Sequence, residues 1–202
     1  MEKVKLTFGE TLKDSIGIAM KNFGIVLGSV FLYAITAWIP YINIGTTIAI
    51  ALLPAELAKG NSFSPTAIFD KKYREMMSDY FIIAGLVSIG ISVGFALMLI
   101  PGIIISLAWS LSTLLVLDKK QKFFDALKNS YNITNGNKWT MFLVPFVFII
   151  IVYILMFIFM LIPFIGIVLM IALLLIFMAI SVGIQASFYR QLVVEPNKEK
   201  AE

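Results

Sequence analysis

The stretch Asp118–Trp139, DKKQKFFDALKNSYNITNGNKW, is the longest charged segment between two very hydrophobic blocks of the chain. Its apolar side chains recur at the spacing of one face of a helix, and polar side chains occupy the opposite face. Asp118 is suited to cap the start of such a helix, and Asn135-Gly136 to end it. The pattern predicts an amphipathic helix over about residues 119–135. Its apolar stripe comprises Phe123, Phe124, Leu127, Tyr131 and Thr134.

The composition on either side of this stretch is that of an integral membrane protein. Of the 202 residues, 60% are hydrophobic and only 14% are charged, whereas a soluble domain is about half apolar and about a quarter charged. The length suits roughly six helical spans of about 20 residues each. The chain has no cysteine and no histidine, which excludes disulfides, thiolate catalysis and the usual zinc sites. We therefore expect an all-α, multi-pass bundle of six transmembrane helices, without a metal or a cofactor.

Lysines gather at the N-terminal end of the predicted amphipathic helix, where the helix dipole disfavours cations. Anionic lipid headgroups would explain their position, because they attract basic side chains next to a membrane. We therefore expect the helix to lie in the membrane interface, with Trp139 as an aromatic anchor. The alternative is a solvated linker that only joins two spans. The expected headgroup contacts are Lys119, Lys120, Lys122 and Lys128, and the expected inserting residues are Phe123, Phe124, Leu127, Tyr131 and Trp139.

Six apolar segments are candidates for membrane spans. A second amphipathic, interfacial segment, residues 1–22, precedes them, with its helix over residues 3–20, and a polar tail, residues 190–202, is predicted to be disordered. Together the spans form a membrane domain over residues 23–189. The expected spans cover residues 23–39, 41–58, 80–100, 103–117, 140–161 and 167–189.

The charge distribution predicts the topology. All 16 lysines and arginines lie before the first span, between spans two and three, between spans four and five, or after span six. The other three connections are short turns at Pro40, Pro101 and Pro163 and carry no charge. Because basic residues are retained on the cytoplasmic side, we expect a cytoplasmic (inner) membrane location with both termini in the cytoplasm. The net charge of +4 is then explained by this retention and not by nucleic-acid binding.

The sequence also carries an internal repeat. Phe8-Gly-Glu-Thr-Leu-Lys-Asp-Ser15 aligns with Phe123-Phe-Asp-Ala-Leu-Lys-Asn-Ser130, and Asn22 falls opposite Asn137. Each of these segments precedes a pair of spans joined by an uncharged turn. We therefore expect three hairpins that enter the membrane from inside and are related by an axis along the membrane normal.

Small residues within the spans predict close packing of helices. Gly24 and Gly28 form a GxxxG motif in the first span, and Gly90 and Gly94 lie beside a ridge of small residues in the third. Hydroxyl side chains in the fourth span can bond back to their own helix carbonyls, so they need no ligand. The alternative for these polar residues is a pore lining formed by Ser106, Ser110 and Gln185.

Three motifs resemble a known family. Ile100-Pro101-Gly102 is followed by Asp125-Ala-Leu-Lys-Asn-Ser130 and then by Thr134-Asn-Gly-Asn-Lys-Trp139. This order is similar to that of a broad group of uncharacterised prokaryotic multi-span proteins, which includes the membrane domain fused to some glycerophosphodiester phosphodiesterases. The resemblance is clearest over residues 99–145. It implies about six helices in a bacterial or archaeal cytoplasmic membrane and no established activity, since the phosphodiesterase chemistry belongs to a separate domain.

The ionisable residues favour a non-enzymatic function. Glu56 and Asp118 flank spans at the lysine-rich edge, where they are explained as interfacial charges or caps, so no catalytic residue is expected. No charge lies at the midplane of the spans, and Pro54 and Pro145 do not occupy corresponding positions, which argues against an ion-coupled transporter. We expect a module that binds anionic membrane lipid or a partner, such as another membrane protein or a second copy. The alternative is a permease subunit or a facilitator for a lipid or an apolar solute.

Overall fold

The computed structural model describes residues 4–196, and every regular element in that range is helical, as predicted. All six apolar segments form helices, because an apolar run without polar neighbours satisfies its backbone groups best within itself. The elements are α1 (Phe8–Lys21), α2 (Phe23–Thr36), α3 (Ile42–Ala58), the 3-10 helix η1 (Pro65–Phe69), α4 (Lys71–Glu75), α5 (Met77–Leu97), α6 (Leu99–Ala108), α7 (Ser112–Lys119), α8 (Phe123–Thr134), α9 (Lys138–Met160), α10 (Ile165–Tyr189) and the π-helix η2 (Arg190–Val194).

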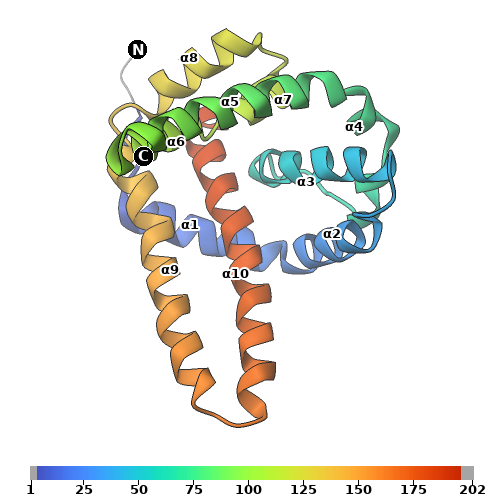
Figure 1. Ribbon diagram of the computed structural model, residues 1–202, viewed down its shortest axis with the longest axis vertical. Helices are drawn as coiled ribbons and strands as arrows, with labels where there is room; N and C mark the ends of the chain where they lie inside the picture. Colours follow the sequence, from blue (N-terminus) through green and yellow to red (C-terminus); the bar gives the residue numbers. More distant parts are fainter. Residues whose placement is uncertain (1–3, 197–202) are drawn as a thin grey trace.

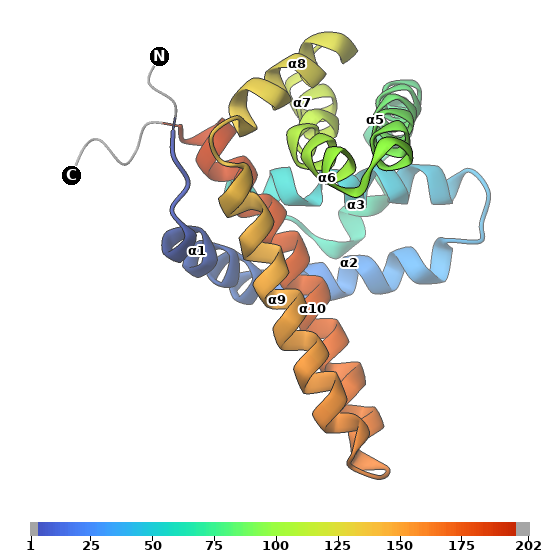
Figure 2. The same ribbon diagram turned by 60° about the vertical axis from the view of Figure 1, so that its left-hand side comes forward.

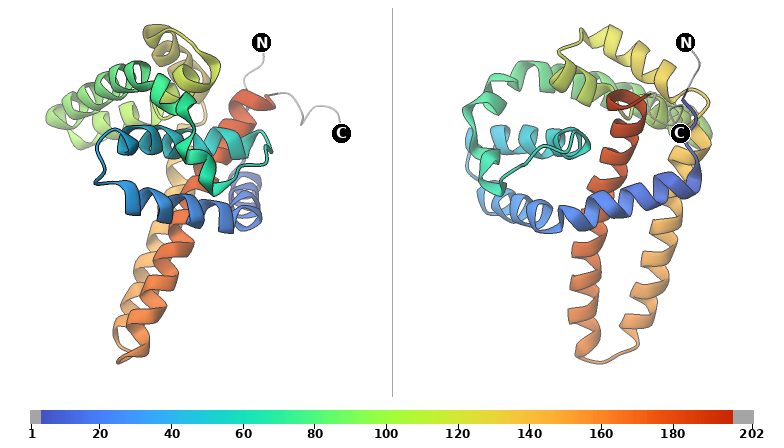
Figure 3. Two further views of the ribbon diagram at one scale, coloured as in Figure 1. Left: turned by 90° about the vertical axis from the view of Figure 1, so that its right-hand side faces the viewer. Right: turned by 180° about the vertical axis from the view of Figure 1, so that it is seen from behind.

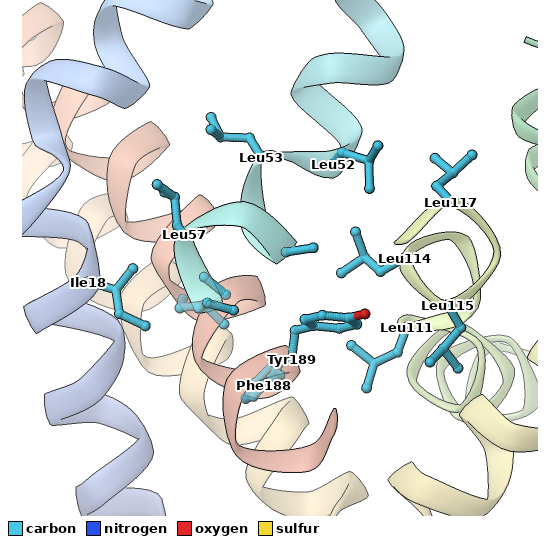
Figure 4. Packing of buried hydrophobic residues seen from close by; sticks show 14 of the residues in the cluster. Ile18, Leu52, Leu53, Leu57, Leu111, Leu114, Leu115, Leu117, Phe188 and Tyr189 are labelled. Atoms are coloured by element: carbon cyan, nitrogen blue, oxygen red, sulfur yellow. The ribbon is translucent and has the colours of Figure 1, made fainter. Parts of the chain in front are cut away.

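Helix α3 lies at the centre of the protein core. It packs against α2, α7 and α10, and most of its side chains are buried. Figure 4 shows Leu57 of α3 on one side of Tyr189 and Leu111, the residue before α7, on the other. Burial on several sides explains why α3 is apolar around its whole circumference and has no amphipathic stripe.

Helices α9 and α10 form a hairpin that extends away from the rest of the chain (Figures 1 and 3). The two helices contain 23 and 25 residues, and at about 1.5 Å per residue each is roughly 35 Å long. Residues 139–189 contain no charged side chain. The large apolar side chains along this hairpin are widely exposed, including Phe164 at its tip. Such a surface requires an apolar environment, and the length of each helix exceeds the ~30 Å hydrocarbon core of a bilayer.

Four helical segments in the described chain are long and apolar enough to cross a membrane, or five if the bent pair α1–α2 counts as one. The four are Met77–Leu97, Leu99–Lys119, Lys138–Met160 and Ile165–Val194. These helices do not share one direction, since α5 and α6 are seen end-on in Figure 2 while α9 and α10 run down the view. The structure therefore supports a multi-pass membrane protein. Its six apolar segments are not arranged as one bundle of parallel helices.

The first predicted hairpin does not fit the predicted topology. After α3, the chain returns along this helix through η1 and α4, both of which contact it. The guanidinium of Arg74 lies 5.4 Å from the centre of the Tyr41 ring, and a Cβ added to Gly45 would lie 2.7 Å from the Arg74 Cγ. The predicted topology places Arg74 on the cytoplasmic side of the membrane and the turn at Tyr41 on the opposite side. Side chains in contact cannot lie on opposite sides of a hydrocarbon layer about 30 Å thick.

The second predicted turn lies elsewhere in the chain. Pro101 and Gly102 were expected to reverse the chain, but both lie within α6. Proline is tolerated there because N–H groups in the first turn of a helix have no partner within it. The chain turns at Met98, which has an extended backbone, and breaks again at Trp109–Leu111, between α6 and α7.

Both ends of the described chain pack against the body. Residues 190–194, predicted to begin a disordered tail, form a π-helix with Leu192 buried. Helix α1 begins at Phe8, later than predicted, and the extended residues before it lie beside Asn137. The predictions for residues 1–3 and 197–202 lie outside the described residues. Both described ends lie far from the tip of the α9–α10 hairpin (Figure 1).

Candidate functional site

Helix α8 docks on the break between α6 and α7. The Ser130 hydroxyl donates a hydrogen bond to the Ala108 carbonyl at 2.7 Å and accepts one from the Leu111 N–H at 3.3 Å. A broken helix leaves such groups without intrahelical partners, and Ser130 satisfies two of them. The buried face of α8 consists of Ala126, Ser130 and Thr134. The fully buried residues of α8 are therefore all small, and among them only Thr134 belongs to the predicted apolar stripe.

The predicted stripe is divided between two sides of α8. Phe123 and Leu127, both predicted to insert into lipid, are partly buried and pack against the core. Phe124 is 76% exposed and Tyr131 is 48% exposed. Lys128 lies on the same outward side, and the ammonium of Lys138 lies 4.7 Å from the centre of the Tyr131 ring. Trp139 is also exposed, at 77%. The outward surface is therefore aromatic and basic, which is typical of a membrane interface.

Three of the four predicted lysines lie before α8 and not on it. Lys119 ends α7, Lys120 has a left-handed backbone with φ 53°, and Lys122 occupies the position before the first helical residue. The predicted helix over residues 119–135 is thus shorter, because the left-handed residue separates α7 from α8. The lysines remain close together in the chain and exposed at this connection.

Asp118 does not cap α8, contrary to the prediction. Its carboxylate forms an ion pair with Lys59, at the end of α3, and accepts a hydrogen bond of 2.7 Å from the Tyr189 hydroxyl. Glu56 joins the same cluster through Lys59, at 3.5 Å. The Asp118 side chain is only 7% exposed, so paired donors are needed to offset its desolvation. This cluster fastens α3, α7 and α10 together.

A hollow of about 460 Å³ opens between the first turn of α5 and the α7–α8 connection. Most of its wall is apolar, and charged groups of both signs border it. Among the described residues, none of Asp79, Lys120 and Lys122 lies within 4.0 Å of an opposite charge. The lining residues are Asp79, Val116, Lys120, Gln121, Lys122, Phe123 and Phe124.

Helix α1 docks in the same manner as α8, in agreement with the sequence repeat. Its buried residues Thr11, Ser15 and Ala19 correspond in the alignment to the three buried residues of α8. They face α10 at Gly183, where an added Cβ would lie 2.4 Å from the Ser15 carbonyl oxygen. Its apolar residues Ile16 and Met20 are exposed. A nearby network joins the two helices: Asp14 pairs with Arg190 and accepts a hydrogen bond of 2.8 Å from Ser187.

The glycines expected to pack helices have different surroundings. Gly24 has no neighbour within 4 Å of an added Cβ, and Gly28 lies against Pro65 of η1 and not against a membrane helix. An added Cβ at Gly90 would overlap the Trp109 ring, and one at Gly94 would lie 3.0 Å from the Gly102 Cα. The second pair therefore lies where α5 packs against α6 and the α6–α7 break, whereas the GxxxG motif makes no helix–helix contact of this kind.

The residues expected for a pore lining do not converge. Ser106 donates to the Ile103 carbonyl at 2.8 Å and Ser110 to the Leu107 carbonyl at 2.9 Å, as predicted for hydroxyls bonded within their own helix. Gln185 is exposed on α10.

Asp79 is the residue of the hollow that the sequence argument did not identify. It is an isolated carboxylate immediately before an apolar span, a position that the argument treated as part of a charged connection. Its position in the chain relative to the candidate spans is the feature that could have identified it. Asp79 begins one candidate span and the lysines follow the end of the next, so adjacent antiparallel spans bring them to one edge.

No known family, curated protein or solved structure matches this chain.

Proposed function

We propose that this protein is a non-enzymatic membrane module that binds anionic phospholipid at the α7–α8 connection. The observation that carries this proposal is the hollow with unpaired lysines at its rim and exposed aromatic side chains beside it. Lys119, Lys120 and Lys122 contact headgroup phosphates from the connection, and Lys128 does so from α8. Phe124, Tyr131 and Trp139 enter the boundary between headgroups and acyl chains.

The positive sign of the lysines and the size of their attraction to an anionic membrane surface both support this proposal. A basic residue next to an anionic membrane surface contributes about 1 kcal/mol of attraction, so four lysines contribute roughly 4 kcal/mol. Lys119 contributes less, because its ammonium lies 3.8 Å from the Asp118 carboxylate. Exposed aromatic groups add apolar burial that is independent of lipid charge. Binding should therefore depend on both anionic lipid and ionic strength.

We propose that the four candidate segments α5, α6–α7, α9 and α10 cross the membrane. Because α5 and α6–α7 run across the direction of α9 and α10 in the structure (Figure 2), this proposal requires the two pairs to align on insertion. The hairpin α2–α3 then remains on the cytoplasmic side, in keeping with the contact between Arg74 and Tyr41. This arrangement still leaves all 16 basic residues on the cytoplasmic side, and it brings both termini there. The predicted arrangement of six spans in three hairpins would instead require the turn at Tyr41 to lie outside.

The motif resemblance is compatible with this proposal. We propose kinship with the uncharacterised prokaryotic multi-span group on the strength of the motifs at residues 100–102 and 125–139 alone. The serine of the second motif, Ser130, holds α8 on the α6–α7 break, so the motif has a structural explanation that does not depend on an activity.

The test uses the full-length protein, purified in a mild detergent and titrated with phosphatidylglycerol during native mass spectrometry. Replacing Lys119, Lys120, Lys122 and Lys128 with glutamine should weaken binding at least about ten-fold, since two of the contacts alone account for more than 1.4 kcal/mol. The matched control replaces the exposed Lys13, Lys21, Lys71 and Lys72, which removes the same charge elsewhere. Equal binding by the two variants would overturn the proposal.

A further inference from the structure

In the proposed four-span arrangement, the hollow at the α7–α8 connection lies at the depth of lipid headgroups. Asp79 belongs to the first turn of α5, the helix of one candidate span, and Lys120 directly follows the last residue of another, Leu99–Lys119. Charged residues at the ends of apolar spans lie at the boundary between hydrocarbon and water. In that arrangement the hollow faces the layer in which phosphates and their attached groups lie, and the exposed Phe124 borders it.

The charges around the hollow have a definite pattern. Two are positive, Lys120 and Lys122, and one is negative, Asp79. The two signs come from different elements, because the lysines belong to the α7–α8 connection and the aspartate belongs to α5. None of them has an ion-pair partner within 4.0 Å among the described residues. A simple anion such as a bare phosphate would be attracted by the lysines and repelled by Asp79.

We infer that the hollow binds the headgroup of an aminophospholipid, in which an ammonium group is attached to the phosphate through a short linker. The phosphate contacts Lys120 and Lys122, and the ammonium donates hydrogen bonds to Asp79. Charge-assisted hydrogen bonds at both ends fix the orientation of the headgroup. This inference rests on the proposed function, which it extends by assigning a selective role to Asp79.

Two headgroups carry the required ammonium, and they differ in charge. Ethanolamine leaves the lipid neutral overall, whereas serine adds a carboxylate that a second lysine can pair. Choline presents a quaternary nitrogen without an N–H, so it cannot donate to Asp79, and glycerol carries hydroxyls in place of a cation. These four headgroups on identical acyl chains therefore separate the contribution of the phosphate from that of the ammonium.

The test measures dissociation constants for the four lipids by native mass spectrometry of the delipidated full-length protein. Wild-type protein should bind the ethanolamine and serine lipids about five-fold more tightly than the choline lipid. Asp79→Asn should abolish this preference and should not weaken binding of the glycerol lipid, because the substitution removes a charge that repels the phosphate and the amide oxygen still accepts from hydroxyls. Asp125→Asn, which removes the same charge from an exposed position on α8, should leave the preference intact.

The outcomes distinguish this inference from the function on which it rests. If Lys120→Gln with Lys122→Gln weakens binding of the glycerol and serine lipids while Asp79→Asn behaves as Asp125→Asn, the lipid site stands and selection by Asp79 is overturned. If the lysine variant binds all four lipids as wild type does, both proposals fail. Tighter binding of the serine than of the ethanolamine lipid would support pairing of its carboxylate with the second lysine.

Discussion

Asn137 provides a sensitive test of how the N-terminus is held. Its side chain is only 2% exposed. The amide oxygen accepts a hydrogen bond of 2.8 Å from the Leu6 N–H, and the amide nitrogen donates one of 2.8 Å to the Val4 carbonyl. Asn137→Ala removes both bonds, at about 0.5–1.5 kcal/mol each, and leaves a buried Leu6 N–H without a partner, at about 1–3 kcal/mol. Since these costs overlap, we expect a total destabilisation of about 2–4 kcal/mol.

The assay is thermal unfolding in detergent, combined with hydrogen exchange at the N-terminal segment. A chain of this size shifts its midpoint by about 2–4 °C for each kcal/mol, so the variant should unfold roughly 5–15 °C lower. Exchange at the Leu6 amide should accelerate strongly. The control is Asn132→Ala, because Asn132 is exposed on α8 and its loss should change stability by less than about 0.5 kcal/mol. Similar midpoints for the two variants, or unchanged exchange at Leu6, would refute this account of the N-terminus.

Three further predictions test the topology and the packing. A single cysteine at Ile39 in this cysteine-free chain should react with an impermeant maleimide from the cytoplasmic side, and one at Phe164 from the outside; labelling of both from outside would restore the six-span arrangement. Gly183→Val should destabilise the protein by about 1–3 kcal/mol, because its side chain would meet the Ser15 carbonyl, whereas an unchanged melting midpoint would disprove tight α1–α10 packing. Burial first, and then the nearby carboxylates of Glu56 and Asp70, raise the pKa of Tyr73 to about 12, and its hydroxyl has no hydrogen-bond partner within residues 4–196. Tyr73→Phe should therefore be neutral or stabilising near pH 7. Because the unfolded phenol ionises near pH 10 and the folded one near 12, wild type should lose stability relative to this variant as pH rises through that window; a parallel pH dependence would contradict the shift.

The helices themselves could be predicted because apolar length is a local property of the sequence. All six apolar runs are helical, although the fourth is divided between α6 and α7. The boundaries of α3 and α10 differ from the expected ones by at most two residues at either end. The turn at Pro101 could not be placed correctly from composition alone. A proline next to a glycine is compatible with a turn and equally with the first turn of a helix. The choice depended on packing, since Gly102 lies against Phe95 and Gly94 of α5.

The role of Asp118 illustrates a contact that no local pattern reveals. An aspartate before an amphipathic segment usually caps the helix, and this prediction was wrong. Its partners, Lys59 and Tyr189, are 59 and 71 residues away. Both donors are brought to Asp118 by the convergence of α3, α7 and α10. Nothing in the sequence indicates that a lysine at the end of one span and a tyrosine near the end of another contact the same carboxylate.

Charge counts were also insufficient for the first hairpin. The rule that basic residues stay inside assigns a side to each connection only after the spans are known. Helix α3 has 17 residues, or about 25 Å at 1.5 Å per residue, which is short for a span. Its return connection carries Arg74 to the turn at Tyr41. A hairpin that never crosses the membrane satisfies the same charge pattern.

The direction in which α8 faces decides between a linker and a lipid-binding surface. In a soluble protein the apolar side of an amphipathic helix packs inward. Here small residues face the protein at Ser130, as small residues do between helices in membranes, and Phe124 and Tyr131 face outward. Helix α1 repeats the arrangement with Ser15 inward and Ile16 outward. Exposing large apolar side chains on both α1 and α8, on the side away from their buried serines, would not stabilise a solvated linker. An apolar outward surface next to unpaired lysines suits the boundary where hydrocarbon and headgroup charge meet, which is why we propose that this edge binds lipid.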